Sequence, residues 1–195
     1  MSQAPLRIGV IIGSVRTGRF ADTVARWAVT QLEQRAELEL DVIDLSAPEI
    51  AEELKLSLDP LEQSPGRRTL AERIGELEGF VLITPEYNHG YPASLKLAID
   101  YVYEGWQAKP VAFVSYGGIA GGLRSVEQLR QVFAEMHAVT VRDVVSFHNA
   151  PQRFGENGEP HDSEEVNKAA GVLIDKLIWW GLTLREGREK RPYTA

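Results

Sequence analysis

The chain has 195 residues, enough for one domain that buries most of its apolar surface without covalent cross-links. It contains no cysteine, which excludes disulfides, thiolate nucleophiles and cysteine metal sites, so any redox chemistry must come from a bound cofactor. The net charge of -7 argues against a nucleic-acid partner, because a phosphate backbone requires a basic surface. No apolar stretch approaches the roughly 20 residues that span a bilayer, and the N-terminus lacks the features of a secretion signal. We therefore expect a cytoplasmic protein with no membrane partner.

Short apolar segments, most of them without alternation, are typical of strands that are covered on both faces of a parallel sheet. In chain order, the expected strands are Leu6 to Ile12, Leu38 to Leu45, Phe80 to Ile83, Val111 to Val114 and Ala138 to Val145.

Apolar residues three to four positions apart predict a helix after each of these strands, near residues 20–32, 70–77, 92–102, 126–133 and 166–178. Regular alternation of strand and helix predicts an α/β doubly wound sandwich with helices on both faces. Five strands in one domain favour the flavodoxin-like order 2-1-3-4-5. We expect residues 1–195 to form a single domain, with an irregular surface stretch from Ser46 to Pro65 and a flexible tail over 185–195.

Ligands of such sheets bind beyond the carboxyl ends of the strands, which directs attention to three loops. After the first strand, Gly13 to Phe20 approaches the P-loop pattern but has Arg19 and Phe20 where a lysine and a hydroxyl residue bind phosphate and Mg²⁺. A nucleoside triphosphatase is therefore disfavoured. Ser14, Arg16 and the backbone N–H groups at a helix start can still hold one phosphate. The alternative is a connecting loop with solvated arginines.

The other two loops follow the third and fourth expected strands. Residues 84–92 read TPEYNHGYP, a stiff loop that can present backbone groups to the edge of a heteroaromatic ring, or else a rigid turn before a helix. Residues 115–122 read SYGGIAGG, in which the glycines allow close approach to a planar ligand, or else form a flexible loop. Because all three loops leave the same edge of the predicted sheet, we expect them to converge.

The fragments GSVRTGRF, PEYNHGYPASLKLAIDY and SYGGIAGGLRSVEQLR together resemble the NADPH-dependent FMN reductase family, which includes flavodoxin-like quinone, azo and chromate reductases. The resemblance implies FMN as cofactor and NADPH or NADH as hydride donor. It places the FMN phosphate on the first loop and the isoalloxazine between the other two. The cofactor-binding residues that it implies are Ser14, Arg16, Arg19, Phe20, Pro85, Glu86, Tyr87, Asn88, Ser115, Tyr116, Gly117 and Gly118.

The resemblance also implies an oxidoreductase that passes hydride through flavin N5 to a small-molecule electron acceptor such as a quinone, a flavin, an azo compound or a metal ion. It implies a homodimer or homotetramer, with the helix near 92–103 at an interface. No side chain is nominated as a catalytic acid or base. The four histidines lack metal-ligand spacing, so no metal site is expected. Of Trp179 and Trp180, we expect one to pack inward and one to face a subunit contact.

Two other classes of function remain open at this stage. A flavodoxin-like electron carrier would dock to protein partners and use no nicotinamide, but carriers of that kind favour a turn without Arg16 and Arg19. A regulatory or structural protein would keep the fold and bind no flavin.

Overall fold

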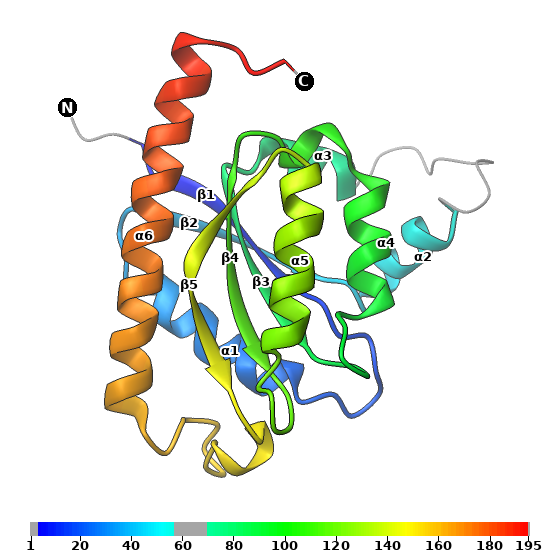
Figure 1. The fold of residues 1–195 in the computed structure, drawn as a ribbon, viewed down its shortest axis with the longest axis vertical. Coiled ribbons are helices and arrows are strands. Elements are labelled where there is room, and N and C mark those ends of the chain that lie inside the picture. The colour runs from blue at the N-terminus through cyan, green and yellow to red at the C-terminus, as the bar shows by residue number, and fades with distance from the viewer. Residues whose placement is uncertain (1–3, 57–69, 195) are drawn as a thin grey trace.

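A computed structural model describes residues 4–56 and 70–194, and its centre is one parallel sheet of five strands in the order β2-β1-β3-β4-β5 (Figure 1). The strands are β1 (Leu6–Ile12), β2 (Leu38–Asp44), β3 (Gly79–Pro85), β4 (Pro110–Tyr116) and β5 (Val139–Phe147). The predicted fold class and strand order are confirmed. Every residue of β3 and β4 is buried, as the unbroken apolar runs indicated.

Helices cover both faces of the sheet, in the positions that right-handed crossovers require (Figure 1). They are α1 (Ala21–Glu33), α2 (Pro48–Leu56), α3 (Leu70–Glu76), α4 (Ala93–Tyr101), α5 (Leu123–Glu135) and α6 (Ser163–Lys190), with short 3₁₀ turns η1 (Glu104–Trp106) and η2 (Ala150–Gln152). One apolar core lies under α1 and α6, and a second lies under α2 to α5.

Large aromatic side chains anchor each core. On the first face, the Trp27 ring meets Phe147 edge-on, with centroids 5.0 Å apart. On the second face, Trp106 packs 4.6 Å from Phe80. Burial of one such side chain contributes about 1.5–3 kcal/mol, so the two layers fix the helices firmly against the sheet.

The prediction of an irregular stretch from Ser46 to Pro65 is wrong in its first part, because α2 spans Pro48–Leu56. Proline is compatible with a first helical position, and Ile50 and Leu54, four residues apart, are both buried. The prolines alone favour a loop, but the four-residue spacing of Ile50 and Leu54 is that of a helix with one buried face. The remainder of the stretch, 57–69, lies outside the described residues.

The prediction of a flexible tail over 185–195 is wrong for residues 185–190, because α6 continues to Lys190. Arg185 is 9% exposed, and its guanidinium binds the Glu78 carboxylate with N–O distances of 2.5 and 2.6 Å. It also donates to the carbonyl oxygens of Ala4 and Pro5, each at 2.8 Å. These contacts attach the last turns of α6 to the amino edge of the sheet, opposite the three predicted loops.

Candidate functional site

The order of the strands reverses between β1 and β3, and the loops that follow these two strands meet there. The Ser14 hydroxyl, just after β1, lies 2.6 Å from the Tyr87 hydroxyl, just after β3. Ser94, in the first turn of α4, donates to the Gly13 carbonyl at 2.6 Å. The third loop joins them because the Glu86 N–H donates to the Tyr116 carbonyl at 3.1 Å. The predicted convergence of the three loops is therefore confirmed.

The turn after β1 leads directly into α1 and leaves the start of that helix available to an anion. Phe20 is the N-cap residue of α1 and makes no side-chain hydrogen bond to the first turn. The N–H groups of a helix start carry a partial positive charge, which attracts a phosphate. Ser14 is fully buried at the base of this turn, whereas residues 15–18 are exposed.

The two arginines of this turn are in different environments. Arg16 is exposed, and its Cζ lies 3.5 Å from the centroid of the Tyr87 ring. The Arg19 side chain is only 11% exposed and binds Asp44 through a two-pronged contact, with N–O distances of 2.7 and 2.5 Å. Arg16 is thus free to meet a ligand, while Arg19 is held by the protein.

Further contacts of Arg19 explain its role in this turn. It donates to the Ser14 carbonyl at 2.6 Å and to Asp22 at 2.9 Å, so it links the turn, α1 and the end of β2. The hydrogen bond to Asp44 raises the pKa of Arg19. Burial acts to raise the pKa of Asp44, but hydrogen bonds from Arg19 and Ser46 outweigh burial and lower it. Both groups are therefore charged near neutral pH.

The loop after β3 contains a tight two-residue turn. Tyr87 and Gly90 exchange two backbone hydrogen bonds, of 2.9 and 3.0 Å. The central residues, Asn88 and His89, have φ values of 51° and 68°. This conformation is uncommon for residues other than glycine but is relatively accessible to asparagine. Both side chains are exposed at the rim, and Pro85 is buried at the end of β3.

The Glu86 carboxylate faces the protein and fastens the second loop to the third. Its side chain is 10% exposed and accepts hydrogen bonds from the Arg124 side chain at 2.7 Å and the Arg124 backbone N–H at 3.3 Å. Arg124 is the second residue of α5, so Glu86 caps that helix from another loop. The Gln128 amide reinforces the junction by donating to the His89 carbonyl at 2.8 Å.

The glycine-rich loop after β4 is fixed by a hydrogen bond from the last part of that strand. The Ser115 hydroxyl donates to the Gly121 carbonyl at 2.9 Å, so this side chain is used inside the loop. Gly122 has φ +87°, and a Cβ atom there would lie 2.7 Å from the Cβ of Ser115. By contrast, a Cβ at Gly118 would meet nothing within 4 Å. Gly118 is therefore open to an approaching ligand, whereas both backbone groups of Gly117 are hydrogen-bonded within the protein, to Phe147 and Ala150.

Two side chains of the predicted set pack beneath these loops. Phe20 lies between the rings of Phe154 and Tyr116, with centroid distances of 5.5 and 6.4 Å. Tyr116 is 6% exposed, and its hydroxyl has no hydrogen-bond partner among the described residues. The sequence reasoning missed this hydroxyl and also the contacts of Asp44, Ser94 and Arg124. The position of Asp44 at the end of β2, at the same edge of the sheet as the three loops, could have indicated its contact with the first loop.

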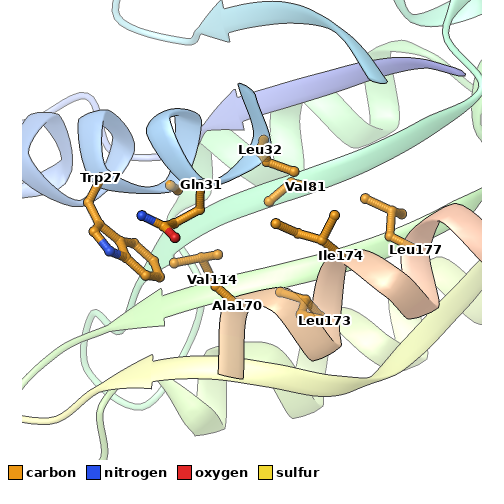
Figure 2. A pocket seen from close by; sticks show the side chains of 10 residues that line it. Trp27, Gln31, Leu32, Val81, Val114, Ala170, Leu173, Ile174 and Leu177 are labelled. Carbon is orange, nitrogen blue, oxygen red and sulfur yellow. The ribbon is translucent and has the colours of Figure 1, made fainter. Parts of the chain in front are cut away.

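Figure 2 shows a small gap elsewhere in the molecule, between α1, α6 and the sheet. Its walls include Trp27, Val81, Val114 and Ile174, which are all buried members of the first apolar core. Such a wall offers no orienting polar groups apart from Gln31. We interpret the gap as a packing feature, separate from the loop site.

The described part of the chain contains no group of three metal-ligating side chains that could hold a metal ion. Across residues 4–56 and 70–194, we also found no helix with the length and apolar character needed to cross a membrane.

A sheet of this order, with an anion-attracting turn after β1 and two bordering loops at the same edge, defines a flavodoxin-like α/β protein with a mononucleotide-type site. The model of the family described as NADPH-dependent FMN reductase matches residues 6–152, and the chain belongs to this family.

Known proteins agree with this assignment. An NAD(P)H-dependent FMN reductase of Schizosaccharomyces pombe is 37% identical over 192 residues, covering 95% of this chain and 94% of that protein. A quinone reductase of Escherichia coli is 33% identical over 180 residues, covering 88% and 86%. A solved flavoenzyme NAD(P)H:(acceptor) oxidoreductase from Paracoccus denitrificans has a TM-score of 0.66 at 20% identity, covering 91% and 98%, which supports the fold.

Proposed function

We propose that this protein is an FMN-dependent NAD(P)H oxidoreductase that delivers reducing equivalents to a small acceptor such as a quinone, a flavin, an azo compound or a metal ion. The observation that carries the proposal is the start of α1, which has no side-chain cap and lies beside the exposed Arg16 and the buried Ser14. Membership of the NADPH-dependent FMN reductase family gives independent support.

The residues of the site fit FMN at both ends. A phosphate would lie against the start of α1, with hydrogen bonds from Ser14 and a charge-assisted fork from Arg16. The loop from Pro85 to Asn88 and the backbone of Gly117 and Gly118 would border the ring system. Bound FMN supplies the two-electron redox chemistry that no side chain of this protein provides.

The protein's own groups then have three tasks. In the second loop the N–H groups of Glu86, Tyr87 and Gly90 are used within the protein, so those of Asn88 and His89 would be the ones to orient the ring edge and stabilise negative charge there. Arg19 and Phe20 support the phosphate turn from beneath through Asp44 and the neighbouring aromatic rings. The Glu86–Arg124 contact keeps the two loops that border the ring at a fixed separation. No side chain is needed as a proton donor or acceptor in this scheme.

We also propose that the protein works in the cytoplasm as a homodimer or homotetramer. Trp179 is 57% exposed and Tyr103, just beyond α4, is 53% exposed, whereas Trp180 packs against the core. Exposed aromatic side chains of this size are enriched at subunit contacts. Light scattering on the purified protein would measure the oligomeric state, and a monomer at micromolar concentration would contradict the proposal.

The decisive experiment combines spectroscopy with a single substitution. Wild-type protein titrated with FMN should bind it and should then oxidise NADPH or NADH in the presence of a quinone. Arg16→Ala should weaken FMN binding by about 1.5–3 kcal/mol, the range for a hydrogen bond to a charged group. Exposed Arg26 on α1, changed to alanine, is the matched control. FMN binding without nicotinamide oxidation would indicate an electron carrier instead, and absence of FMN binding would refute the proposal.

A further inference from the structure

Among the described residues of the site, the Tyr116 hydroxyl is the one buried side-chain group without a hydrogen-bond partner. The residue is 6% exposed, and the hydroxyl forms no hydrogen bond among the described residues. Buried hydroxyls are nearly always paired, because an unpaired one loses its hydration without compensation. An exception beside a ligand site makes this hydroxyl a candidate partner for a ligand atom, which would reach it once a neighbouring side chain moves aside, because the hydroxyl itself is covered by protein.

The surroundings of this hydroxyl identify which part of the ligand it faces. Burial raises the pKa of Tyr116, and the other groups that act on it are Tyr87, Ser14, Arg19 and Asp22. The nearby Ser14 hydroxyl acts to lower the pKa of Tyr116, but Ser14 forms its hydrogen bond with the Tyr87 hydroxyl, and the Tyr116 hydroxyl is left without one among the described residues. These residues belong to the phosphate turn, the first turn of α1 and the loop after β3. The Tyr116 ring also lies 6.4 Å, centroid to centroid, from Phe20, the N-cap residue of α1, so these neighbours place Tyr116 at the anion end of the site.

We propose that the Tyr116 hydroxyl donates a hydrogen bond to the phosphate of FMN, as the third hydroxyl of a group formed with Ser14 and Tyr87. This inference rests on the proposed function and changes the role of Tyr116 from a border of the ring to a ligand of the phosphate. The hydroxyl stays protonated near neutral pH because burial disfavours the phenolate, and donation to an anion requires that proton.

This assignment predicts opposite effects of one substitution on stability and on binding. Tyr116→Phe keeps the ring that packs against Phe20 and removes only the hydroxyl. In the protein without FMN, the hydroxyl is buried and unpaired, so its removal should leave the unfolding midpoint unchanged or raise it. In the complex, the same change removes a charge-assisted hydrogen bond, so FMN should bind about tenfold more weakly or worse.

The experiment measures dissociation constants for FMN and riboflavin, together with urea midpoints of the flavin-free proteins. Tyr116→Phe should weaken FMN binding and leave riboflavin binding unchanged, because riboflavin lacks the phosphate. Tyr193→Phe, which removes an exposed hydroxyl that contacts His137 at the opposite edge of the sheet, is the matched control. Unchanged FMN affinity would overturn the inference. Equal loss for both ligands would also overturn it, by placing the hydroxyl on the sugar chain or the ring.

A lower midpoint for flavin-free Tyr116→Phe would also contradict the inference, because it would mean that the hydroxyl already has a partner within the protein. The wild-type titration separates this failure from a failure of the proposed function. If wild-type protein binds FMN and Tyr116→Phe binds it equally well, the function stands and the role of Tyr116 does not. If wild-type protein binds no FMN, both fail.

Discussion

Arg19→Lys tests whether Arg19 binds the ligand or supports the turn that binds it. Lysine keeps the positive charge but cannot reproduce the two-pronged contact with Asp44 or, at the same time, the bond to the Ser14 carbonyl. The substitution removes about two charge-assisted hydrogen bonds, and lysine can replace one of them in part. We therefore expect the free energy of unfolding to fall by about 1–2 kcal/mol. FMN binding should weaken as a consequence, because the phosphate turn is no longer fixed.

A double-mutant cycle with Asp44→Asn gives the sharper measurement. If Arg19 acts through Asp44, the two substitutions should be non-additive by about 1 kcal/mol in urea unfolding of the flavin-free protein at pH 7. Asp44 is the right partner to remove because its folded pKa is lowered. Its stabilising contribution is therefore complete above the unfolded pKa and is lost only as the pH falls through the folded value.

The control is Arg35→Lys, which alters a more exposed ion pair with Asp175 and should change stability by less than about 0.5 kcal/mol. The reasoning fails if Arg19→Lys leaves flavin-free stability unchanged and weakens FMN binding as much as Arg16→Ala does. Arg19 would then be a direct ligand of the phosphate, as the family resemblance implied.

Three further predictions concern the fold around the site. Gly122→Ala should lower the free energy of unfolding by about 2–4 kcal/mol, because φ is +87° and the new Cβ would meet the β4 backbone. Gly171→Ala in α6 is the control and should leave the stability unchanged or raise it. Equal effects of the two substitutions in thermal unfolding would contradict this reasoning. Burial lowers the pKa of Lys109 to about 7, so between pH 7 and 10 the unfolded chain binds more protons than the folded protein does. The free energy of unfolding should therefore rise over this range by up to about 1.4 kcal/mol per pH unit. Lys109→Met should remove this rise, and an unchanged slope would refute the assignment. Arg185→Met should cost about 3–5 kcal/mol in urea unfolding, because it leaves the half-buried Glu78 carboxylate with only the Arg7 backbone N–H and removes the donors to Ala4 and Pro5. A loss below about 1 kcal/mol would mean that α6 is not anchored there.

The parts of the fold that the sequence predicted correctly depend on patterns within single segments. Unbroken apolar runs indicated strands buried on both faces, and the alternation of strands with helices determined the order of the sheet. The errors arose where a local signal competed with a tertiary one. The prolines near α2 predicted a loop, although a helix forms there. The charged residues after Leu184 predicted a flexible tail, although the Arg185–Glu78 ion pair holds the end of α6 against the sheet.

The location of the site was predictable for the same reason, since loops that follow parallel strands must leave the same edge of the sheet. The direction of individual side chains was not predictable. Arg19 and Asp44 are 25 residues apart, and Glu86 and Arg124 are 38 apart. No local pattern reports such a contact, so a charged residue on a binding loop could be assigned equally well to a ligand or to a distant partner.

The side chains of the site fall into two groups, and this division explains how the site can be rigid and still have groups free to bind a ligand. Arg19, Glu86 and Ser115 are used in contacts within and between loops, so they hold the walls in place before any ligand arrives. Arg16 and Tyr116 retain unused hydrogen-bonding capacity at the anion end. A wall fixed in advance reduces the ordering cost of binding, and the unused donors provide the favourable contacts. Substitutions in the first group should therefore lower the stability of the flavin-free protein, whereas those in the second group should weaken binding and leave that stability unchanged or, at Tyr116, higher.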